Sequence, residues 1–527
     1  MSSLTLKTAQ QPNRLAVATW NIAAVNNNPF EYWITMKDNP AYNKMMNDVE
    51  LFIESPDEHD ISVSQVFTSD MYNQLEKSMQ SIGRVSSSDL AVVKKLWTND
   101  YSQRKIVSGF LKDTTFGKKR LASMPDRITN TINVATSDSP VCRPTVINMY
   151  EGDLSTIPSW FTKWHEFMFN TPLTLIGSST PQNVYNMLQP ILASKYPAIT
   201  PEEEAVSVPL QVVACAIFDA ILVHMLNVVS GPEVWQPMKS AIVTSLNKQK
   251  TPSTLNILNT QYSNMDIICL QEVSAAFIQS AENMATLASK FWVVKPAALD
   301  SKRDQNSVIL LSKVRFPGGS LGEITELVKF PQGVKVPVAK GDILAIKTKD
   351  AQNVDYVVAS FHGDTNGLAT IPVVTALQET MKEGSNGLEN FKLVFGLDAN
   401  TYEKGTIDKK GAKEKQDVME FGVEYVKLGL TSNFGDKPIR DNFTTFNART
   451  YLQPQLNKAC KSSEKRECGD VNPKDFILFK RGDWDVVGTG KDNTGKGEYL
   501  EDTPFPTLEW PSDHGLLWGV LERAEES

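Results

Sequence analysis

Seven short apolar runs are the feature that most constrains the fold of this 527-residue chain. Each run is four to six residues long and apolar on both faces, which is typical of buried strands rather than of helices. The sequence therefore predicts buried strands that are covered by helices or by a second sheet. The runs are "LAVATW" (15–20), "MDIICL" (265–270), "SVILLS" (307–312), "YVVASF" (356–361), "KLVFGL" (392–397), "FILF" (476–479) and "LLWGVL" (516–521).

Polar residues stand directly at the ends of six of these runs. In an antiparallel sheet, the ends of strands that run in one direction lie beside the starts of strands that run in the other. We therefore expect six strands to deliver polar side chains to one edge. The residues in question are Asn21, Gln271 and Glu272, His362, Asp398, Asp475 and His514.

A stretch of more than 200 residues with a different pattern separates the first run from the second. Segments there, such as "SDMYNQLEKSMQSI" and "PSWFTKWHEFMF", have the apolar spacing of helices, and strand signals are scarce. The sequence thus predicts one domain formed by 1–33 and 236–527, and a mostly helical insertion at 34–235. The later stretch "KEKQDVMEFGVEYVKLGL" predicts one further helix.

The most apolar stretch, 208–229, is long enough to cross a membrane. It contains Asp219, and a charged residue in the middle of a bilayer is costly, so we predict a buried helix and no transmembrane segment. The start "MSSLTLKTAQQPNR" has no apolar signal core, and the five cysteines are widely spaced without a CxxC pair. These features predict free thiols and a cytoplasmic location, with a nuclear location as the alternative. The net charge of −8 argues against broad coating of DNA or of an anionic membrane.

The polar strand ends belong to six motifs: "ATWNI", "DIICLQEV", "SFHGD", "GLDAN", "KDFIL" and "PSDHG". In this order they resemble the signature set of the endonuclease/exonuclease/phosphatase superfamily, which includes DNase I, and are nearest to its deadenylase-like and nocturnin-like members. The resemblance covers 15–33 and about 236–523. It implies an α/β fold, a four-layered sandwich of two packed, mostly antiparallel sheets flanked by helices, here with a large helical insertion. It also implies metal-dependent cleavage of phosphoesters.

The chemistry of the residues agrees with this resemblance. A phosphodiester repels a nucleophile, so its hydrolysis needs a divalent cation, positioned donors and a group that activates water. Glu272 offers the hard oxygen that Mg²⁺ prefers. The resemblance makes Glu272 the principal metal ligand, with Asn21 beside it and Asp513 completing the metal environment through water; Mg²⁺ is the expected cofactor and Mn²⁺ the alternative. Without the other motifs, Glu272 would be a surface carboxylate and Asn21 a turn cap.

Asp398 and Asn400 in "GLDAN" are two residues apart and would face the same side of an extended segment. Asp398 would orient or deprotonate the attacking water, and the amide of Asn400 would donate to a phosphoryl oxygen. The alternative is an Asx turn after a strand.

Two of the five histidines, His362 and His514, fall in the motifs. Protonated His514 could stabilise charge on the pentacovalent phosphorus if a carboxylate holds its ring. Asp475 matches the family position for that carboxylate. His362 would donate to a nonbridging oxygen.

Two places depart from the family pattern. "SFHGDTNG" stands where many relatives have "THL", so Asp364 and Asn366 either contact the substrate or form a turn before a helix, and the turn is slightly favoured. In the stretch 443–459, Arg449 could pair with a phosphate and Tyr451 could stack on a base, and structural packing explains both residues equally well.

These expectations converge on a Mg²⁺-dependent phosphodiesterase whose substrate is a phosphate ester, namely RNA, DNA or a nucleotide. The alternatives within this fold are a phosphomonoesterase and a phospholipid diesterase, because one fold hosts several substrates. A different class of alternative is a non-catalytic scaffold that binds partners through the insertion. No expected ligand or base is replaced in the motifs, which favours the enzyme. Protein partners cannot be inferred from the sequence.

Overall fold

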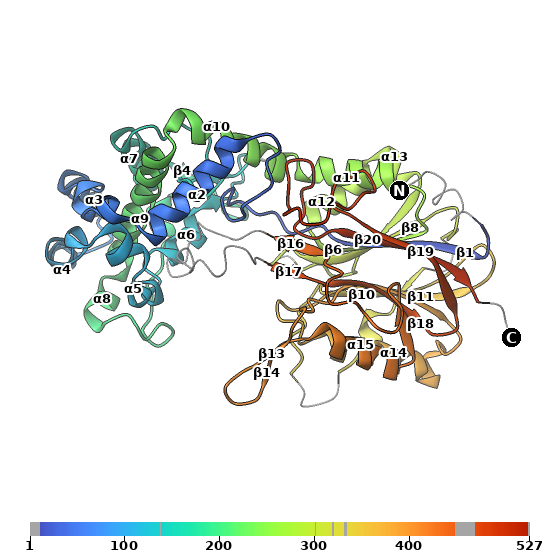
Figure 1. Cartoon of the computed structure of the whole chain (residues 1–527). Coiled ribbons are helices and arrows are strands. Elements are labelled where there is room, and N and C mark those ends of the chain that lie inside the picture. The colour runs from blue at the N-terminus through green and yellow to red at the C-terminus, as the bar shows by residue number, and fades with distance from the viewer. Residues whose placement is uncertain are drawn as a thin grey trace. The chain divides into compact units, whose positions relative to one another are not determined.

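The computed structural model describes residues 11–524 except 138, 301, 319–320, 331–334 and 448–469. The chain divides into two compact units, which are described separately (Figure 1). The sandwich unit comprises Met1–Val25, Lys248–Asn447 and Gly469–Ser527, and the described part of the helical unit is Asn26–Asn247.

The division between the units lies at 25/26 and 247/248, whereas the sequence placed it at 33/34 and 235/236. Both connecting stretches belong to the helical unit because they bind each other. The Asn247 amide donates to the Asn27 side-chain oxygen at 2.9 Å and to the Asn26 carbonyl at 3.4 Å.

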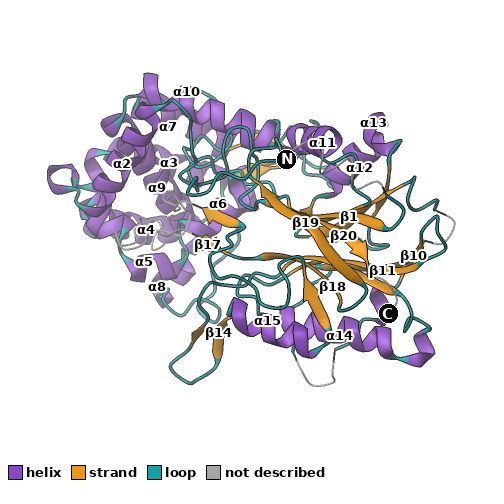
Figure 2. Ribbon diagram, turned by 45° about the vertical axis from the view of Figure 1, so that its right-hand side comes forward, coloured by secondary structure: helices purple, strands orange, loops and turns teal. Residues whose placement is uncertain are grey.

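Two six-stranded sheets form the centre of the sandwich unit (Figure 2). The first has the order β19-β20-β1-β6-β8-β7, and the second has the order β15-β18-β12-β11-β10-β9. The strands of the first sheet are β1 (Arg14–Asn21), β6 (Ile267–Val273), β7 (Phe291–Val294), β8 (Asn306–Ser312), β19 (Trp484–Asp492) and β20 (Leu516–Arg523). Those of the second are β9 (Gly322–Glu323), β10 (Ile343–Lys349), β11 (Asp355–His362), β12 (Lys392–Asp398), β15 (Leu430–Ser432) and β18 (Asp475–Lys480).

Three apolar cores explain why the strands are buried on both faces. In β1, Leu15 and Val17 point into the core between the sheets, whereas Ala16 and Ala18 point into a core under the outer helices. A third core lies between the second sheet and its helices. The outer helices of the first sheet are α11 (Lys250–Gln261), α12 (Ala275–Asn283) and α13 (Ala285–Ala288), and those of the second are α14 (Thr370–Lys382) and α15 (Val418–Lys427) (Figure 1). The predicted α/β sandwich is therefore confirmed.

Both sheets are mixed, because each contains one parallel pair within otherwise antiparallel neighbours. The parallel pairs are β1 with β6 and β11 with β12. The helix predicted for "KEKQDVMEFGVEYVKLGL" is shorter than expected, because the Asp417 side chain caps α15 and residues before it form β14 (Lys413–Lys415), paired with β13 (Thr406–Ile407). Two further strands, β16 (Thr445–Asn447) and β17 (Asp470–Asn472), form a separate pair.

Gly396 in β12 packs closely against side chains of the facing sheet. A Cβ atom there would lie 2.5 Å from the Cβ of Cys269 and 3.0 Å from that of Thr19. We expect Gly396→Ala to lower the free energy of unfolding by about 1–3 kcal/mol, the usual range for overpacking of a core. Gly519→Ala is the matched control in β20, since no atom comes within 3.6 Å of a Cβ added there. Equal effects of both changes in urea unfolding would contradict this packing.

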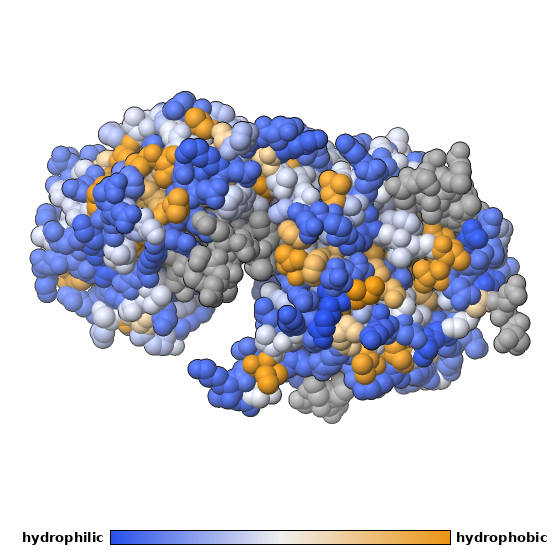
Figure 3. Space-filling model, in the orientation of Figure 1, coloured by the Kyte–Doolittle hydropathy of each residue, from blue (hydrophilic) through white to orange (hydrophobic). Residues whose placement is uncertain are grey.

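The helical unit is built around α9 (Ser207–Val229). This helix is long and apolar enough to span a membrane, but 78% of its most apolar window is buried inside the structure. Apolar side chains on the face of the molecule in Figure 3 gather only in separate patches among polar ones. The other helices are α2 (Pro40–Glu54), α3 (Ser69–Ile82), α4 (Ser87–Asn99), α5 (Thr114–Lys119), α6 (Ser123–Thr129), α7 (Ile157–His165), α8 (Pro201–Ala205) and α10 (Pro232–Val243).

A buried ion pair holds α9 in the helical unit. Asp219 in the middle of α9 accepts from Arg143 Nε at 2.7 Å, from the Thr145 hydroxyl at 2.6 Å and from the Trp164 indole at 2.8 Å. Asp219 and Arg143 are both fully buried. The negative charge of Asp219 in this apolar helix is thus compensated by the positive charge of Arg143.

Asp219→Ala should destabilise the helical unit by about 3 kcal/mol, the low end of the range for breaking a buried pair, because Arg143 loses one carboxylate partner and keeps the other, Asp126. The control is Asp48→Ala, which breaks an exposed pair with Lys44 and should cost less than about 1 kcal/mol. Urea unfolding monitored by tryptophan fluorescence measures both changes. A cost for Asp219→Ala no greater than that of the control would show that the pair does not hold the unit.

Candidate active site

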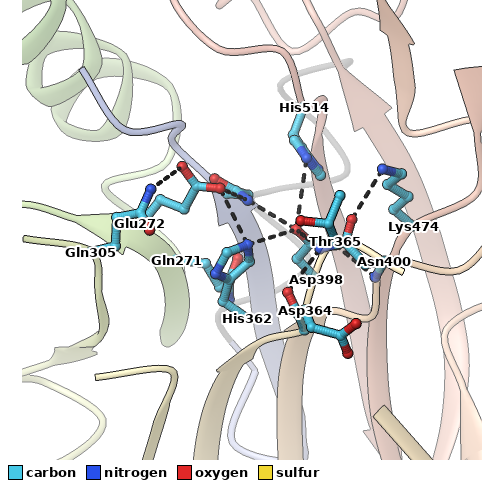
Figure 4. Close-up of polar contacts among 12 residues, drawn as sticks. Gln271, Glu272, Gln305, His362, Asp364, Thr365, Asp398, Asn400, Lys474 and His514 are labelled. Carbon is cyan, nitrogen blue, oxygen red and sulfur yellow. Dashed lines mark hydrogen bonds and ion pairs between the residues drawn. The ribbon is translucent and has the colours of Figure 1, made fainter. Parts of the chain in front are cut away.

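The polar strand ends meet at one edge of the sandwich unit (Figure 4). In the second sheet, His362 is opposite Asp398, and Asp398 is opposite Asp475. In the first sheet, Asn21 is opposite Gln271, directly before Glu272. The edge forms a pocket of about 610 Å³, whose lining includes Glu272, His362, Asp398, Asn400, Asp513 and His514. Asn21 and Asp475 are fully buried beside it.

Glu272 is held in an unusual backbone conformation. Its φ is +57°, in a place where the register between β6 and β8 shifts. A non-glycine residue in this region costs about 1–3 kcal/mol and is found preferentially at functional sites. Side chains along a strand normally point to alternate faces of the sheet. The register shift breaks this alternation at Glu272 and turns its carboxylate into the pocket.

Four donors surround the Glu272 carboxylate. Oε1 accepts from Asn21 Nδ2 at 3.1 Å and lies 3.2 Å from His362 Nε2. Oε2 accepts from the Ala24 N–H at 2.6 Å and from Gln305 Nε2 at 3.5 Å. Burial alone would raise the pKa of Glu272, but the hydrogen bond and charge of His362 hold it well below its usual range. Glu272 is therefore a carboxylate at all ordinary pH values.

Asn21 joins the two sheets at the site. Its Nδ2 donates to Glu272 and, at 2.9 Å, to Asp398 Oδ2. Its Oδ1 accepts from the Ala23 N–H at 2.9 Å. In this arrangement Asn21 positions the two carboxylates, and its oxygen is directed to the backbone rather than toward Glu272.

Asp398 and Asn400 form the Asx turn that was one alternative for "GLDAN", and both also line the pocket. The Asn400 N–H donates to Asp398 Oδ1 at 2.9 Å. The Asn400 Nδ2 donates to the Gly363 carbonyl at 2.9 Å and to Asp398 Oδ2 at 3.3 Å. Asn400 also has a positive φ, of +48°, which asparagine tolerates better than most residues.

His514 lies between two carboxylates. Its Nδ1 is 2.9 Å from Asp475 Oδ2, and its Nε2 is 3.7 Å from Asp398 Oδ2. Burial alone would lower the pKa of His514, but the charges of Asp475 and Asp398 raise it to about 10. The ring is therefore an imidazolium at neutral pH.

His362 is the second imidazolium of the pocket. It is 3.2 Å from Glu272 Oε1 and 3.7 Å from Asp398 Oδ2. Burial alone would lower its pKa, whereas Glu272, followed by Asp398 and Asp342, raises it to about 9. Carboxylates and imidazoliums thus alternate along the pocket, in the order Glu272, His362, Asp398 and His514.

Two sets of groups at this edge could hold a metal ion. Asp398, Asp475 and His514 place possible ligand atoms within 4.8 Å of one another. However, an imidazolium has no lone pair for a metal, and the raised pKa of His514 favours that form. Glu272 and Asp513 line the same pocket and offer only oxygen, which fits Mg²⁺ with its preference for few carboxylates and several waters.

One predicted substrate contact, Asn366, does not line the pocket. Asn366 is exposed and lies in the turn before α14, where the Asp364 carboxylate accepts from the Asn366 and Ala369 N–H groups. Asp364 itself lines the pocket. Arg449 and Tyr451 lie outside the described residues.

Sequence reasoning missed two neighbours of the predicted residues. Lys474, directly before Asp475, is buried and donates to Asn400 Oδ1 at 3.0 Å. Gln305, directly before β8, reaches Glu272. The signal for Lys474 was its place in "KDFIL", beside a residue already selected. Gln305 had no comparable signal, because only the packing of β8 against β6 brings it to the site.

A family described as a domain of unknown function (DUF8234) matches residues 60–240, which lie in the helical unit. No curated protein matches the chain in sequence.

Solved structures with a similar fold include the following three. An endonuclease/exonuclease/phosphatase family protein from Bacteroides thetaiotaomicron is 16% identical over 53% of this chain and 88% of its own, with a TM-score of 0.33. TDP2 of D. rerio, complexed with a single-strand DNA product, is 12% identical over 52% and 91%, with a TM-score of 0.29. The human nocturnin catalytic domain is 13% identical over 54% and 89%, with a TM-score of 0.33. The structural neighbours of this chain are thus endonuclease/exonuclease/phosphatase proteins, at low identity and over about half of its length.

Proposed function

We propose that the sandwich unit is a Mg²⁺-dependent phosphodiesterase that hydrolyses nucleic acids or nucleotides. One observation carries the proposal: Glu272, His362, Asp398 and His514, from four separate strand ends, line one pocket, and Asp475 binds His514 from beside it. A carboxylate to bind a cation, a carboxylate to accept a proton and two imidazolium donors are the groups that phosphoester hydrolysis requires.

Asp398 accepts the proton of the attacking water. Its Oδ2 is held by Asn21 and lies within 4 Å of both histidines, at 3.7 Å from each Nε2. His514, kept protonated by Asp475, stabilises the negative charge that develops on the phosphoryl oxygens. His362 and Asn400 donate to the nonbridging oxygens. The water is thereby aligned on phosphorus by groups already in place before the substrate binds.

Glu272 and Asp513 would hold the metal ion, and Asn21 would keep Glu272 in position. When bound there, Mg²⁺ would neutralise charge on the phosphate and polarise a P–O bond. Both residues already line the pocket, so neither has to move out of the protein interior to bind the metal ion.

The pocket favours a substrate of nucleotide size at the point of cleavage. Its volume of about 610 Å³ lies within the range of small-molecule sites, which is about 300–1,000 Å³. Arg303 and Lys335 add cationic groups to its lining. The overall charge of −8 agrees with recognition inside a pocket rather than on a broad basic surface.

A substrate panel tests the proposal. Purified full-length protein is offered poly(A), single-stranded and double-stranded DNA, dinucleotides, inositol phosphates and sphingomyelin, with Mg²⁺, with Mn²⁺ or with EDTA. We expect metal-dependent hydrolysis of a nucleic acid or nucleotide. Hydrolysis of only the inositol phosphates or only sphingomyelin would replace the proposed substrate, and no metal-dependent hydrolysis of any member would contradict the activity.

A further inference from the structure

Lys474 is a buried cation to which the proposed chemistry assigns no role. It directly precedes β18 and is 3% exposed. Its Nζ donates to Asn400 Oδ1 at 3.0 Å, forms an ion pair with Asp470 and lies 5.1 Å from the centre of the Tyr402 ring. Burying an ammonium is costly unless its hydrogen bonds are satisfied, so this position requires such partners.

The contact with Lys474 determines which way the Asn400 amide faces. An ammonium has three donors and no acceptor, so the group opposite it must be the oxygen of the amide. The Asn400 nitrogen is then directed to the other side, where the Gly363 carbonyl and the Asp398 carboxylate lie at 2.9 and 3.3 Å. Rotation of the amide by half a turn would face its nitrogen to the ammonium and its oxygen to two acceptors.

The backbone of Asn400 gives a reason why such a partner is needed. With a φ of +48°, the residue adopts a conformation that few side chains tolerate, and Gly367 packs its backbone against the Asn400 carbonyl. The backbone thus brings the side chain to the pocket, but it does not select which end of the amide points inward. Lys474 on one side, and the Gly363 carbonyl and Asp398 carboxylate on the other, supply this selection.

We propose that Lys474 is a positioning residue, which acts through Asn400 by fixing the amide nitrogen on the side of the pocket where the phosphoryl oxygens bind. This inference rests on the proposed function for its effect on rate, but not for its effect on the geometry of Asn400.

A double-mutant cycle tests the effect on rate. Lys474→Met keeps the length of the side chain and removes its donors, so we expect kcat to fall roughly 10-fold to 10²-fold with little change in KM, up to the scale for loss of a preorganised donor. In an Asn400→Ala background, the same change should alter kcat by less than about twofold, because the two residues act as one unit. Independent, multiplying losses would overturn the inference, as would a loss confined to KM.

Lys415→Met is the matched control. Lys415 lies 4.2 Å from the centre of the same Tyr402 ring but does not bind Asn400, so its replacement should leave kcat unchanged. If Lys474→Met does not fold, Lys474→Arg takes its place in both backgrounds. A loss of kcat that the arginine causes in the wild-type background must then be absent from the Asn400→Ala background.

A crystal structure of the Lys474 variant provides a readout that does not depend on activity. We expect the Asn400 side chain to move away from the Gly363 carbonyl, since its oxygen then loses its donor and the two acceptors of its nitrogen hold the amide from one side only. An unchanged side chain, still within hydrogen-bonding distance of Gly363 and Asp398, would overturn the inference. If the wild-type protein hydrolyses no substrate, the proposed function fails, and this comparison still decides the role of Lys474.

Discussion

Glu272→Gln should reduce turnover by more than ~10²-fold, the scale seen when a preorganised group is removed from a charged transition state. The change keeps the size of the side chain and removes the charge that would bind the metal. It also removes the partner that raises the pKa of His362. Initial rates over a range of Mg²⁺ concentrations measure the effect, and isothermal titration calorimetry with Mg²⁺ or Mn²⁺ should show weaker binding without any substrate.

Glu282→Gln is the control for this experiment. Glu282 lies on α12 of the same unit, pairs with Lys295 at 2.6 Å and does not line the pocket. Its replacement should leave turnover and metal binding unchanged, and both variants should retain a cooperative unfolding transition. Wild-type turnover of Glu272→Gln at low Mg²⁺ would remove Glu272 from the metal site.

The Asp475–His514 pair should set the alkaline limit of activity. The pKa of His514 is raised to about 10, so the imidazolium persists at neutral pH and is lost as the pH rises through that value. The contribution of this pair to the free energy of unfolding follows the same proton. It is fully present below the unfolded histidine pKa of about 6.5 and is lost as the pH rises through the folded-state pKa of about 10. Asp475→Asn removes the largest charge that raises the pKa, and therefore should move the alkaline limb of the rate profile to lower pH.

His514→Ala should lower turnover by roughly 10²-fold or more. Since the two residues act as a unit, the double variant should be little worse than His514→Ala alone. Four pH–rate profiles, from wild type, the two single variants and the double variant, measure these effects. Fully additive losses, or an alkaline limb that Asp475→Asn leaves in place, would mean that the aspartate does not hold the histidine.

The sequence could predict the strand ends because their signal is local. Buried strands of six or seven residues are visible as apolar runs, and a polar residue directly after such a run stands out. Asp398 and His362 are neighbours because β11 and β12 are in register. The parallel pairing itself could not be predicted, since it depends on which crossover the chain makes between the strands. The edge strand β19 was missed because half of its residues are exposed and it lacks an apolar run.

The details of the site depend on geometry that the sequence does not encode locally. Glu272 enters the pocket through a register shift and a positive φ, and neither leaves a mark in "DIICLQEV". The contact between Lys474 and Asn400 joins residues 74 positions apart. The place of Asn21 beside the metal stays a prediction, and the hydrogen bond from the Ala23 N–H to its oxygen was not visible in the sequence. Side-chain direction at a strand end therefore had to come from the structure.

Solvent-isotope tracing tests the central claim most directly, namely that Asp398 directs a water molecule at phosphorus. The preferred substrate is hydrolysed in ¹⁸O-labelled water with Mg²⁺, and the label in the phosphoryl product is counted by mass spectrometry. We expect the wild-type protein, and Asp485→Asn with its exposed carboxylate on β19, to place ¹⁸O in the phosphoryl group at the same rate, and Asp398→Asn to do so at least ~10²-fold more slowly. A wild-type rate of labelling in Asp398→Asn, or label found only in the leaving group, would contradict the account.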